Sequence, residues 1–342
     1  MKLDPTTIGN LYDRSHIPRP DGLAMFAVRG ALVNNGSVLL NTDAYDFWND
    51  TIGLVDFQTG EMFGFWAATA GQPGTYWTKH SDYAGADSGA PFTMPCGNIA
   101  LTTGLHRGKW WSLIQRDGVA GSYPVVRDTD QDEVLEARDK FTWTTRANGI
   151  NVHWEELKSQ RVRFASSGCH VMNYAYNSKE RKAFKDVVER YQKQGQQTIR
   201  YSVFEGSWMI DGRERVLYGS VGDGVKWFQN LLNTDGYPVR VDGEFGQLTH
   251  ERAVQRSRAL FKAGTPNTLK VDQWGVGIVP EPAKANPYEL AIAFGGHGNI
   301  IPFTMPDGKT AQIKVRDLAQ AFGATVDSTK WPKLAMQIGA EK

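Results

Sequence analysis

Short apolar runs, each followed by Gly, Asp or Asn, fill residues 1 to about 175 and constrain the fold more than any other feature. Four of these runs cover residues 23–28, 37–40, 54–57 and 110–114. Runs of this length and spacing are typical of β-strands joined by tight turns. We therefore predict a mainly β domain over residues 1–205, with a strand at 198–204 returning to its sheet.

Two later blocks have helical periodicity instead. Residues 178–194 begin with Ser178, place apolar side chains at 184, 187, 188 and 191, and are followed by Gly195, which predicts a capped amphipathic helix. In the second block, Val225, Phe228, Leu231 and Leu232 fall on one helix face. A stop at 233–237 and a tight turn at Asp242-Gly243 follow, and Thr249 is expected to cap the last helix.

The chain has 342 residues, enough for more than one domain. We predict a multidomain α+β protein with a mainly β domain at 1–205, a small helical domain at 212–264 and a small α/β segment at 265–342. Four prolines between residues 263 and 290 predict an irregular link before that segment.

Charge and apolar content limit the classes of partner that we expect. A formal net charge of +1 gives no electrostatic reason to expect nucleic acid. The first residues hold no apolar signal segment and no run of eighteen apolar residues occurs, so we expect synthesis in the cytoplasm without membrane insertion. The two cysteines, Cys96 and Cys169, are expected to be free thiols, with Cys96 structural.

Cys169 is the candidate nucleophile. It follows Ser166-Ser167-Gly168 and lies sixteen residues after His153, which sits in an apolar alternating run typical of a strand. A thiol needs a nearby base and backbone donors for the oxyanion. We expect a hairpin or loop to bring Cys169 beside His153, and the N–H groups of Gly168 and Cys169 to face the oxyanion. His170 should point to the opposite face.

These residues resemble the catalytic motif of the L,D-transpeptidase family. Ser166, Gly168, Cys169 and the upstream His153 match that motif, whereas Ser167 stands where the family has His and Val171 where it has Arg. The upstream turn at residues 71–76 is also similar to the family's turn before the substrate cleft. The resemblance implies a mainly β catalytic domain with catalytic Cys169, His153, Gly168 and Ser166. The candidate substrate contacts near the thiol are Tyr76, Trp154 and Ser167.

The helical block closely resembles the three-helix peptidoglycan-binding domain of wall hydrolases. Its Asp-Gly-x-Phe-Gly turn at 242–246 and its Leu-Leu-Asn-x-x-Gly-Tyr helix end at 231–237 are intact, although Ser257-Arg258 stands where the family usually has Phe-Gln. This resemblance implies that Asp242 and Phe245 contact the wall. Residues 300–326 weakly resemble a small stalk repeat of cell-surface proteins.

Together these features predict a phage-type endolysin, a hydrolase that cleaves peptidoglycan stem peptides or cross-links through a Cys169 thioester. The expected partners are bacterial peptidoglycan and a holin-type pore that delivers the protein to the wall. Two alternatives stay open. One is an L,D-transpeptidase that builds cross-links, and the other is a non-catalytic wall-binding or virion structural protein.

A metal cofactor is not expected. Asp128, Asp130, Asp132 and Asp139 have the spacing of calcium ligands in an EF-hand-like loop, but Glu133 stands where that loop needs Gly, which favours a solvated acidic loop. His80, Asp82 and His106 suggest zinc, yet no His or Cys pair with zinc-ligand spacing supports it.

Overall fold

The computed structural model describes residues 1–34, 36–41, 46–71, 92–115, 122–127, 140–144, 149–262, 275–279, 302–304 and 310–312. The chain divides into two compact units, Met1–Val279 and Pro280–Lys342. In the second unit, β16 (Pro302–Thr304) pairs with β17 (Thr310–Gln312). None of the described helices combines the length and apolarity needed to cross a membrane.

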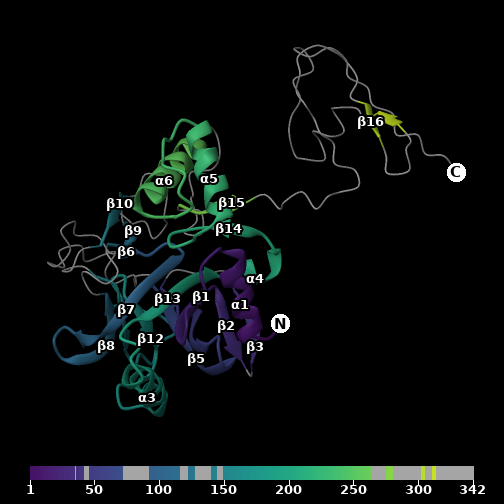
Figure 1. The fold of residues 1–342 in the computed structure, drawn as a ribbon. Coiled ribbons are helices and arrows are strands. Elements are labelled where there is room, and N and C mark those ends of the chain that lie inside the picture. The colour runs from purple at the N-terminus through teal and green to yellow at the C-terminus, as the bar shows by residue number, and fades with distance from the viewer. Residues whose placement is uncertain are drawn as a thin grey trace. The chain divides into compact units, whose positions relative to one another are not determined.

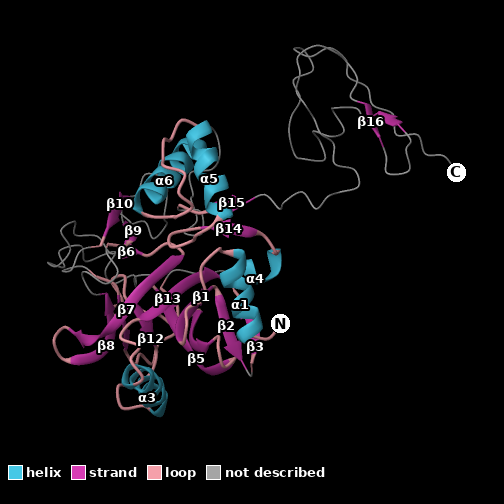
Figure 2. Ribbon diagram, in the orientation of Figure 1, coloured by secondary structure: helices cyan, strands magenta, loops and turns pink. Residues whose placement is uncertain are grey.

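The first unit mixes helices with a larger share of strands (Figure 2). Its centre is a closed eight-stranded barrel (Figure 1). Around the barrel the order is β1 (Leu23–Arg29), β13 (Ile199–Glu205), β7 (Gly97–His106), β8 (Trp110–Gln115), β11 (Asn151–Trp154), β12 (His170–Met172), β5 (Glu61–Ala70) and β4 (Asp50–Asp56). The predicted strands at 23–28, 110–114 and 198–204 are confirmed.

Two barrel pairs, β1 with β13 and β11 with β12, are parallel, and the other barrel pairs are antiparallel. Of the two connections expected between His153 and Cys169, the hairpin is excluded because a hairpin joins antiparallel strands, and the loop is confirmed. Parallel strands need a crossover of about a dozen residues or more, and residues 155–169 supply it.

Smaller sheets and helices surround the barrel. Helix α1 (Pro5–Arg14) begins where Asp4 accepts a hydrogen bond from the N–H of Thr7. Helix α3 (Lys179–Lys193) is capped by Ser178, as predicted, and buries Phe184 and Val188. The remaining elements are the pair β2 (Ala31–Asn34) and β3 (Ser37–Leu40), the sheet β10 (Lys140–Trp143), β9 (Pro124–Arg127) and β6 (Phe92–Thr93), and helix α4 (Trp208–Asp211).

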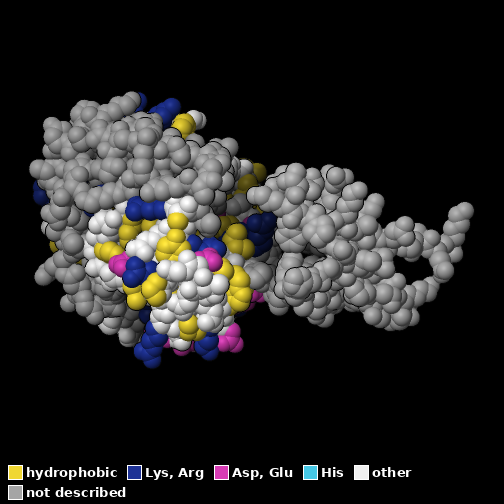
Figure 3. Space-filling view, turned by 90° about the horizontal axis from the view of Figure 1, so that it is seen from above, with side chains coloured by type: hydrophobic (Ala, Val, Ile, Leu, Met, Phe, Trp, Pro, Cys, Tyr) yellow, Lys and Arg dark blue, Asp and Glu magenta, His cyan; other side chains and the backbone are white. Residues whose placement is uncertain are grey.

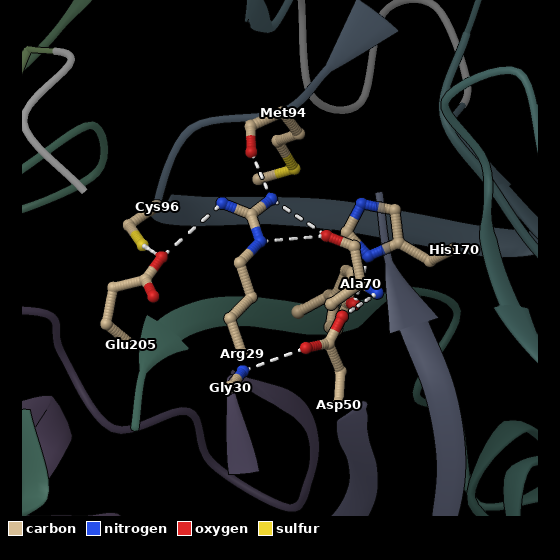
Figure 4. A network of polar contacts seen from close by, with 9 residues as sticks. Arg29, Gly30, Asp50, Ala70, Met94, Cys96, His170 and Glu205 are labelled. Carbon is tan, nitrogen blue, oxygen red and sulfur yellow. Dashed lines mark hydrogen bonds and ion pairs between the residues drawn. The ribbon is translucent and has the colours of Figure 1, made fainter. Parts of the chain in front are cut away.

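A buried arginine ties the barrel strands together (Figure 4). The guanidinium of Arg29 donates hydrogen bonds to the carbonyl oxygens of Ala70 and Met94 and lies 3.7 Å from the carboxylate of Glu205. The thiol of Cys96 donates to the same carboxylate at 3.3 Å. Cys96 is fully buried and both cysteines are free, as expected, so Cys96 belongs to the barrel interior.

Helices α5 (Asp223–Thr234) and α6 (Gln247–Lys262) lie beside β14 (Glu214–Val216) and β15 (Gly277–Val279), and together these four elements are here called the helical module (Figure 1). Its own core contains Val216, Val225, Phe228, Leu232, Phe245, Ala253 and Val279. The described residues include two long helices here, where three helices are expected. Strand β15 falls beyond the predicted boundary at residue 264 because its three residues carry no periodic signal.

The helical module and the barrel share contacts within the first unit. The N–H of Val221 donates to the carbonyl of His16 at 2.8 Å, and the indole N–H of Trp143 donates to Glu251 at 3.0 Å. Leu217, just before the module's first helix, is fully buried in the barrel's core. Thr249 lies inside α6 and is not its cap: its hydroxyl instead meets Gln229 at 3.2 Å.

The face of the molecule in Figure 3 carries basic and acidic side chains interspersed with apolar ones. Among the described side chains of this view, no extended field of one charge stands out.

Candidate functional site

Cys169 and His153 meet on neighbouring parallel strands. The register pairs Val152 with His170 and His153 with Val171, so Cys169 stands directly before β12 and next to the start of β11. The sulfur of Cys169 and a ring nitrogen of His153 lie within 4.8 Å of each other. The sequence-predicted nucleophile and base are therefore brought together.

His106 joins them from a third strand. It ends β7, which β8 separates from β11 around the barrel. Its ring stacks on that of His153, with centroids 4.2 Å apart and planes inclined by 13°. Ring nitrogens of both histidines and the Cys169 sulfur all lie within 4.8 Å of one another. Sequence reasoning considered His106 with His80 and Asp82, which lie outside the described residues, and missed its contact with the thiol.

Both imidazoles are neutral at neutral pH. Burial lowers the pKa of His153 to about 3, helped by the neighbouring His106 and by the charge of Arg107. Burial and Arg107 lower the pKa of His106 to about 4. The Nδ1 atom of His153 lies 3.4 Å from the carbonyl oxygen of Trp154. A proton on Nδ1 would leave the lone pair of Nε2 available as a base.

The thiol of Cys169 is protonated at rest. Its pKa is raised by burial, against the opposing influence of hydrogen bonds from the backbone and side chain of Asn151 and of the charge of Arg107. The site therefore holds a neutral thiol and a neutral base, and not a preformed thiolate–imidazolium pair. Asn151 is a second residue that sequence reasoning missed. Strand alternation places residues 151 and 153 on the same face, so that pattern could have found it.

The loop that leads into Cys169, here called the nucleophile loop, is held in place by Ser166. The buried Ser166 hydroxyl accepts a hydrogen bond from the N–H of Gly168 at 3.0 Å and donates one to the carbonyl of Cys169 at 2.7 Å. The expectation that the Gly168 N–H faces the oxyanion is wrong in this conformation because Ser166 already uses it. Gly168 has φ of +133°, and a Cβ there would lie 2.6 Å from Phe92.

His170 faces away from the thiol, as predicted. Its Nδ1 contacts the hydroxyl of Tyr201, and both side chains are fully buried in the barrel. Val171, in the position of the family's arginine, is also buried and packs with Trp48 and Val162 on the cluster that includes Cys169.

The expected substrate contacts separate into three groups. Trp154 is 1% exposed and packs against Trp66 and Phe184 in the core, and Phe245 is 2% exposed in the helical module's core, so neither side chain is available to a ligand. Ser167 is partly exposed in the nucleophile loop, and Asp242 is exposed at its turn. Tyr76 lies outside the described residues, as do the calcium candidates Asp128, Asp130, Asp132 and Asp139.

A pocket of about 630 Å³ opens close to the cluster of Trp48, Val162 and Val171 against which Cys169 packs. Trp48 and Leu157 line the pocket and also belong to the cluster that Cys169 packs against. Phe47 and Lys158 line it as well. The pocket thus offers aromatic surface and one cationic side chain near the nucleophile loop.

Comparison of the chain with protein-family models, with curated proteins and with solved structures found no match.

Proposed function

We propose that this protein is a cysteine peptidase that cleaves the stem peptides or peptide cross-links of bacterial peptidoglycan. The observation that supports this most is the meeting of Cys169 and His153 across β11 and β12. The residues around the thiol resemble the L,D-transpeptidase motif, and the helical module resembles a peptidoglycan-binding domain. The Cys169–His153 pair supports the proposed chemistry, and the two resemblances support the proposed substrate class.

In the acylation step, the sulfur of Cys169 attacks the carbonyl carbon of a peptide bond while its proton passes to His153. The C–N bond then breaks, and His153 returns the proton to the leaving amine. A thioester remains on Cys169. Because both groups start neutral, the proton moves during the attack and no thiolate needs to accumulate beforehand.

The oxyanion needs donors other than the Gly168 N–H. The backbone N–H of Cys169 and the side-chain amide of Asn151 are the candidates. In the resting site the amide hydrogen-bonds to Cys169 and donates to the Gly149 carbonyl at 3.4 Å, so it would exchange one of these partners for the oxyanion. Loss of one such donor typically lowers kcat by about 10²–10³-fold. We expect Asn151→Ala to lower kcat by this amount. Asn151→Asp should lower it equally, because a carboxylate cannot donate a hydrogen bond to an anion.

The thioester then meets an acceptor. Water, deprotonated by His153, gives a free carboxylate and restores the thiol, whereas an amine gives a new cross-link. Val171 replaces the family's arginine, and Lys158 in the nearby pocket can contact a stem-peptide carboxylate instead. Lys158→Met should then raise KM more than it lowers kcat.

The helical module would hold the protein on the wall. Asp242 accepts hydrogen bonds from Gln229 at 2.8 Å and from the N–H of Glu244 at 3.0 Å, so it holds the turn in shape. Trp227 is 37% exposed and Leu248 is 48% exposed on the module's surface, and aromatic side chains with one exposed face suit sugar rings. Trp227→Ala should therefore weaken sedimentation with purified wall.

Digestion of purified peptidoglycan in water labelled with heavy oxygen tests the proposal. Hydrolysis should release muropeptides whose new carboxyl group carries one heavy oxygen, as read by mass spectrometry. A cross-linked product without label would identify a transpeptidase. An unchanged wall to which the protein nevertheless binds would leave the non-catalytic alternative and overturn the proposal.

A further inference from the structure

Three side chains with metal-binding atoms converge at the candidate site from three separate places in the chain. His106 ends β7, His153 lies within β11 and Cys169 precedes β12. Their ligand atoms, two ring nitrogens and one sulfur, all lie within 4.8 Å of one another. The sequence distance between His106 and the other two explains why no local ligand motif marks this cluster.

The nitrogen atoms are available to a ligand. The buried Nδ1 of His106 has no hydrogen-bond partner among the described residues. The Nδ1 of His153 lies 3.4 Å from the Trp154 carbonyl, which leaves Nε2 to the cluster. A histidine that donates its other N–H to a backbone carbonyl is the usual arrangement of a metal ligand, because the carbonyl fixes the tautomer and the ring orientation.

Metal binding requires the three ligand atoms to move closer together and one imidazole ring to turn. Tetrahedral zinc with bonds of about 2.0–2.3 Å separates its ligand atoms by about 3.3–3.8 Å, somewhat less than the 4.8 Å limit within which these atoms lie. The two imidazoles are nearly parallel, inclined by 13°, so their lone pairs cannot meet at one point until one ring turns. His106 is the one that can turn, because it is partly exposed whereas His153 is 5% exposed.

We propose that His106, His153 and Cys169 together bind one Zn²⁺ ion. Imidazole and thiolate are the ligands that zinc prefers, and three protein ligands leave the fourth tetrahedral position to water. On binding, the thiol proton is released to solvent and the sulfur bonds to the ion. If the proposed function holds, the ion occupies the nucleophile and its base, and it therefore inhibits peptide cleavage reversibly.

A cobalt titration tests the site itself. Co²⁺ accepts tetrahedral zinc sites and shows a charge-transfer absorption when bound by a thiolate. Added to the full-length, reduced, chelator-treated protein, it should saturate at one ion per chain with this absorption, and Zn²⁺ should displace it. His106→Ala removes one of the three ligands, so it should weaken Co²⁺ binding by at least the roughly 10–100-fold that loss of an outer-shell partner typically costs. Cys169→Ser should remove the absorption, and Cys96→Ser, at the other thiol, should retain it.

Absence of the absorption in the wild-type protein, or its persistence in Cys169→Ser, would overturn the site. Peptide cleavage by the same samples separates the two proposals. Cleavage by metal-free protein that Zn²⁺ abolishes and chelator restores supports inhibition, and His106→Ala should then need more Zn²⁺. Cleavage without any Co²⁺ binding removes the metal site and keeps the peptidase. Co²⁺ binding without peptide cleavage keeps the metal site and removes the peptidase. Cleavage that requires Zn²⁺ overturns the inhibitory role.

Discussion

The hydroxyl of Ser166 donates a hydrogen bond to the carbonyl oxygen of Cys169 at 2.7 Å while it accepts one from the N–H of Gly168. Ser166→Ala would leave both backbone groups without this buried partner, at a cost of about 1–3 kcal/mol for each unsatisfied group. We expect a lower midpoint of urea unfolding and slower cleavage. Ser167→Ala is the matched control for stability, because Ser167 contributes its backbone carbonyl to Phe92. An unchanged midpoint in Ser166→Ala would contradict this role.

Gly168 should tolerate no side chain. A Cβ at this position would lie 2.6 Å from both the ring and the carbonyl oxygen of Phe92, and φ is +133°. Gly168→Ala must therefore shift the nucleophile loop, and strain of this kind costs about 1–3 kcal/mol. The expected result is loss of cleavage with retained wall binding. Gly195 is also at positive φ but has open space around it. Gly195→Ala therefore introduces backbone strain without a steric clash and is the control for strain alone.

Alkylation of Cys169 should be slow at neutral pH. Burial raises its pKa, so the thiolate fraction at pH 7 is smaller than for an ordinary cysteine and grows as pH rises through the raised value. In chelator-treated protein, the iodoacetamide rate at Cys169 should still increase above the pH at which a free thiol has levelled off. His153→Ala should slow the reaction further at neutral pH, because the imidazole takes the thiol proton during the attack and not beforehand. A rate plateau below pH 8 would show an activated thiolate and contradict the neutral pair.

Acid should destabilise the fold through His250. This side chain is fully buried, neither ring nitrogen has a hydrogen-bond partner among the described residues, and burial lowers its pKa to about 3. Below the ordinary histidine pKa of about 6.5, the unfolded chain binds a proton that the folded chain does not. The free energy of unfolding should therefore fall by about 1.4 kcal/mol per pH unit between about pH 6.5 and 3. In His250→Leu this part of the slope should disappear, and an unchanged slope in urea titrations would rule it out.

The strands and helices with strong local patterns could be predicted from the sequence. Ser178 and Gly195 bound α3 because a cap and a positive-φ glycine act within a few residues. Val225, Phe228 and Leu232 reached the core of the helical module because helical spacing alone sets their face. The parallel pairing of β11 with β12 could not be predicted, since it depends on the path of the crossover.

The site was predictable where strand alternation applies and not where distant strands meet. Alternation separates His170 from Cys169 and places Asn151 with His153, although Asn151 was not inferred. His106 comes from another strand across β8, so no spacing in the sequence relates it to the thiol. The expected substrate contact of Trp154 is wrong, because its indole packs against Trp66 and Phe184 in the core.

Release of muropeptides from purified peptidoglycan by wild-type protein, Cys169→Ala and Cys96→Ser is the most direct test of the central claim. Cys96 is the matched control because it is the chain's other thiol and contacts Glu205 inside the barrel. We predict release by the wild type and by Cys96→Ser, and none by Cys169→Ala, which should still sediment with the wall. Equal release by Cys169→Ala would contradict a thioester mechanism at this cysteine.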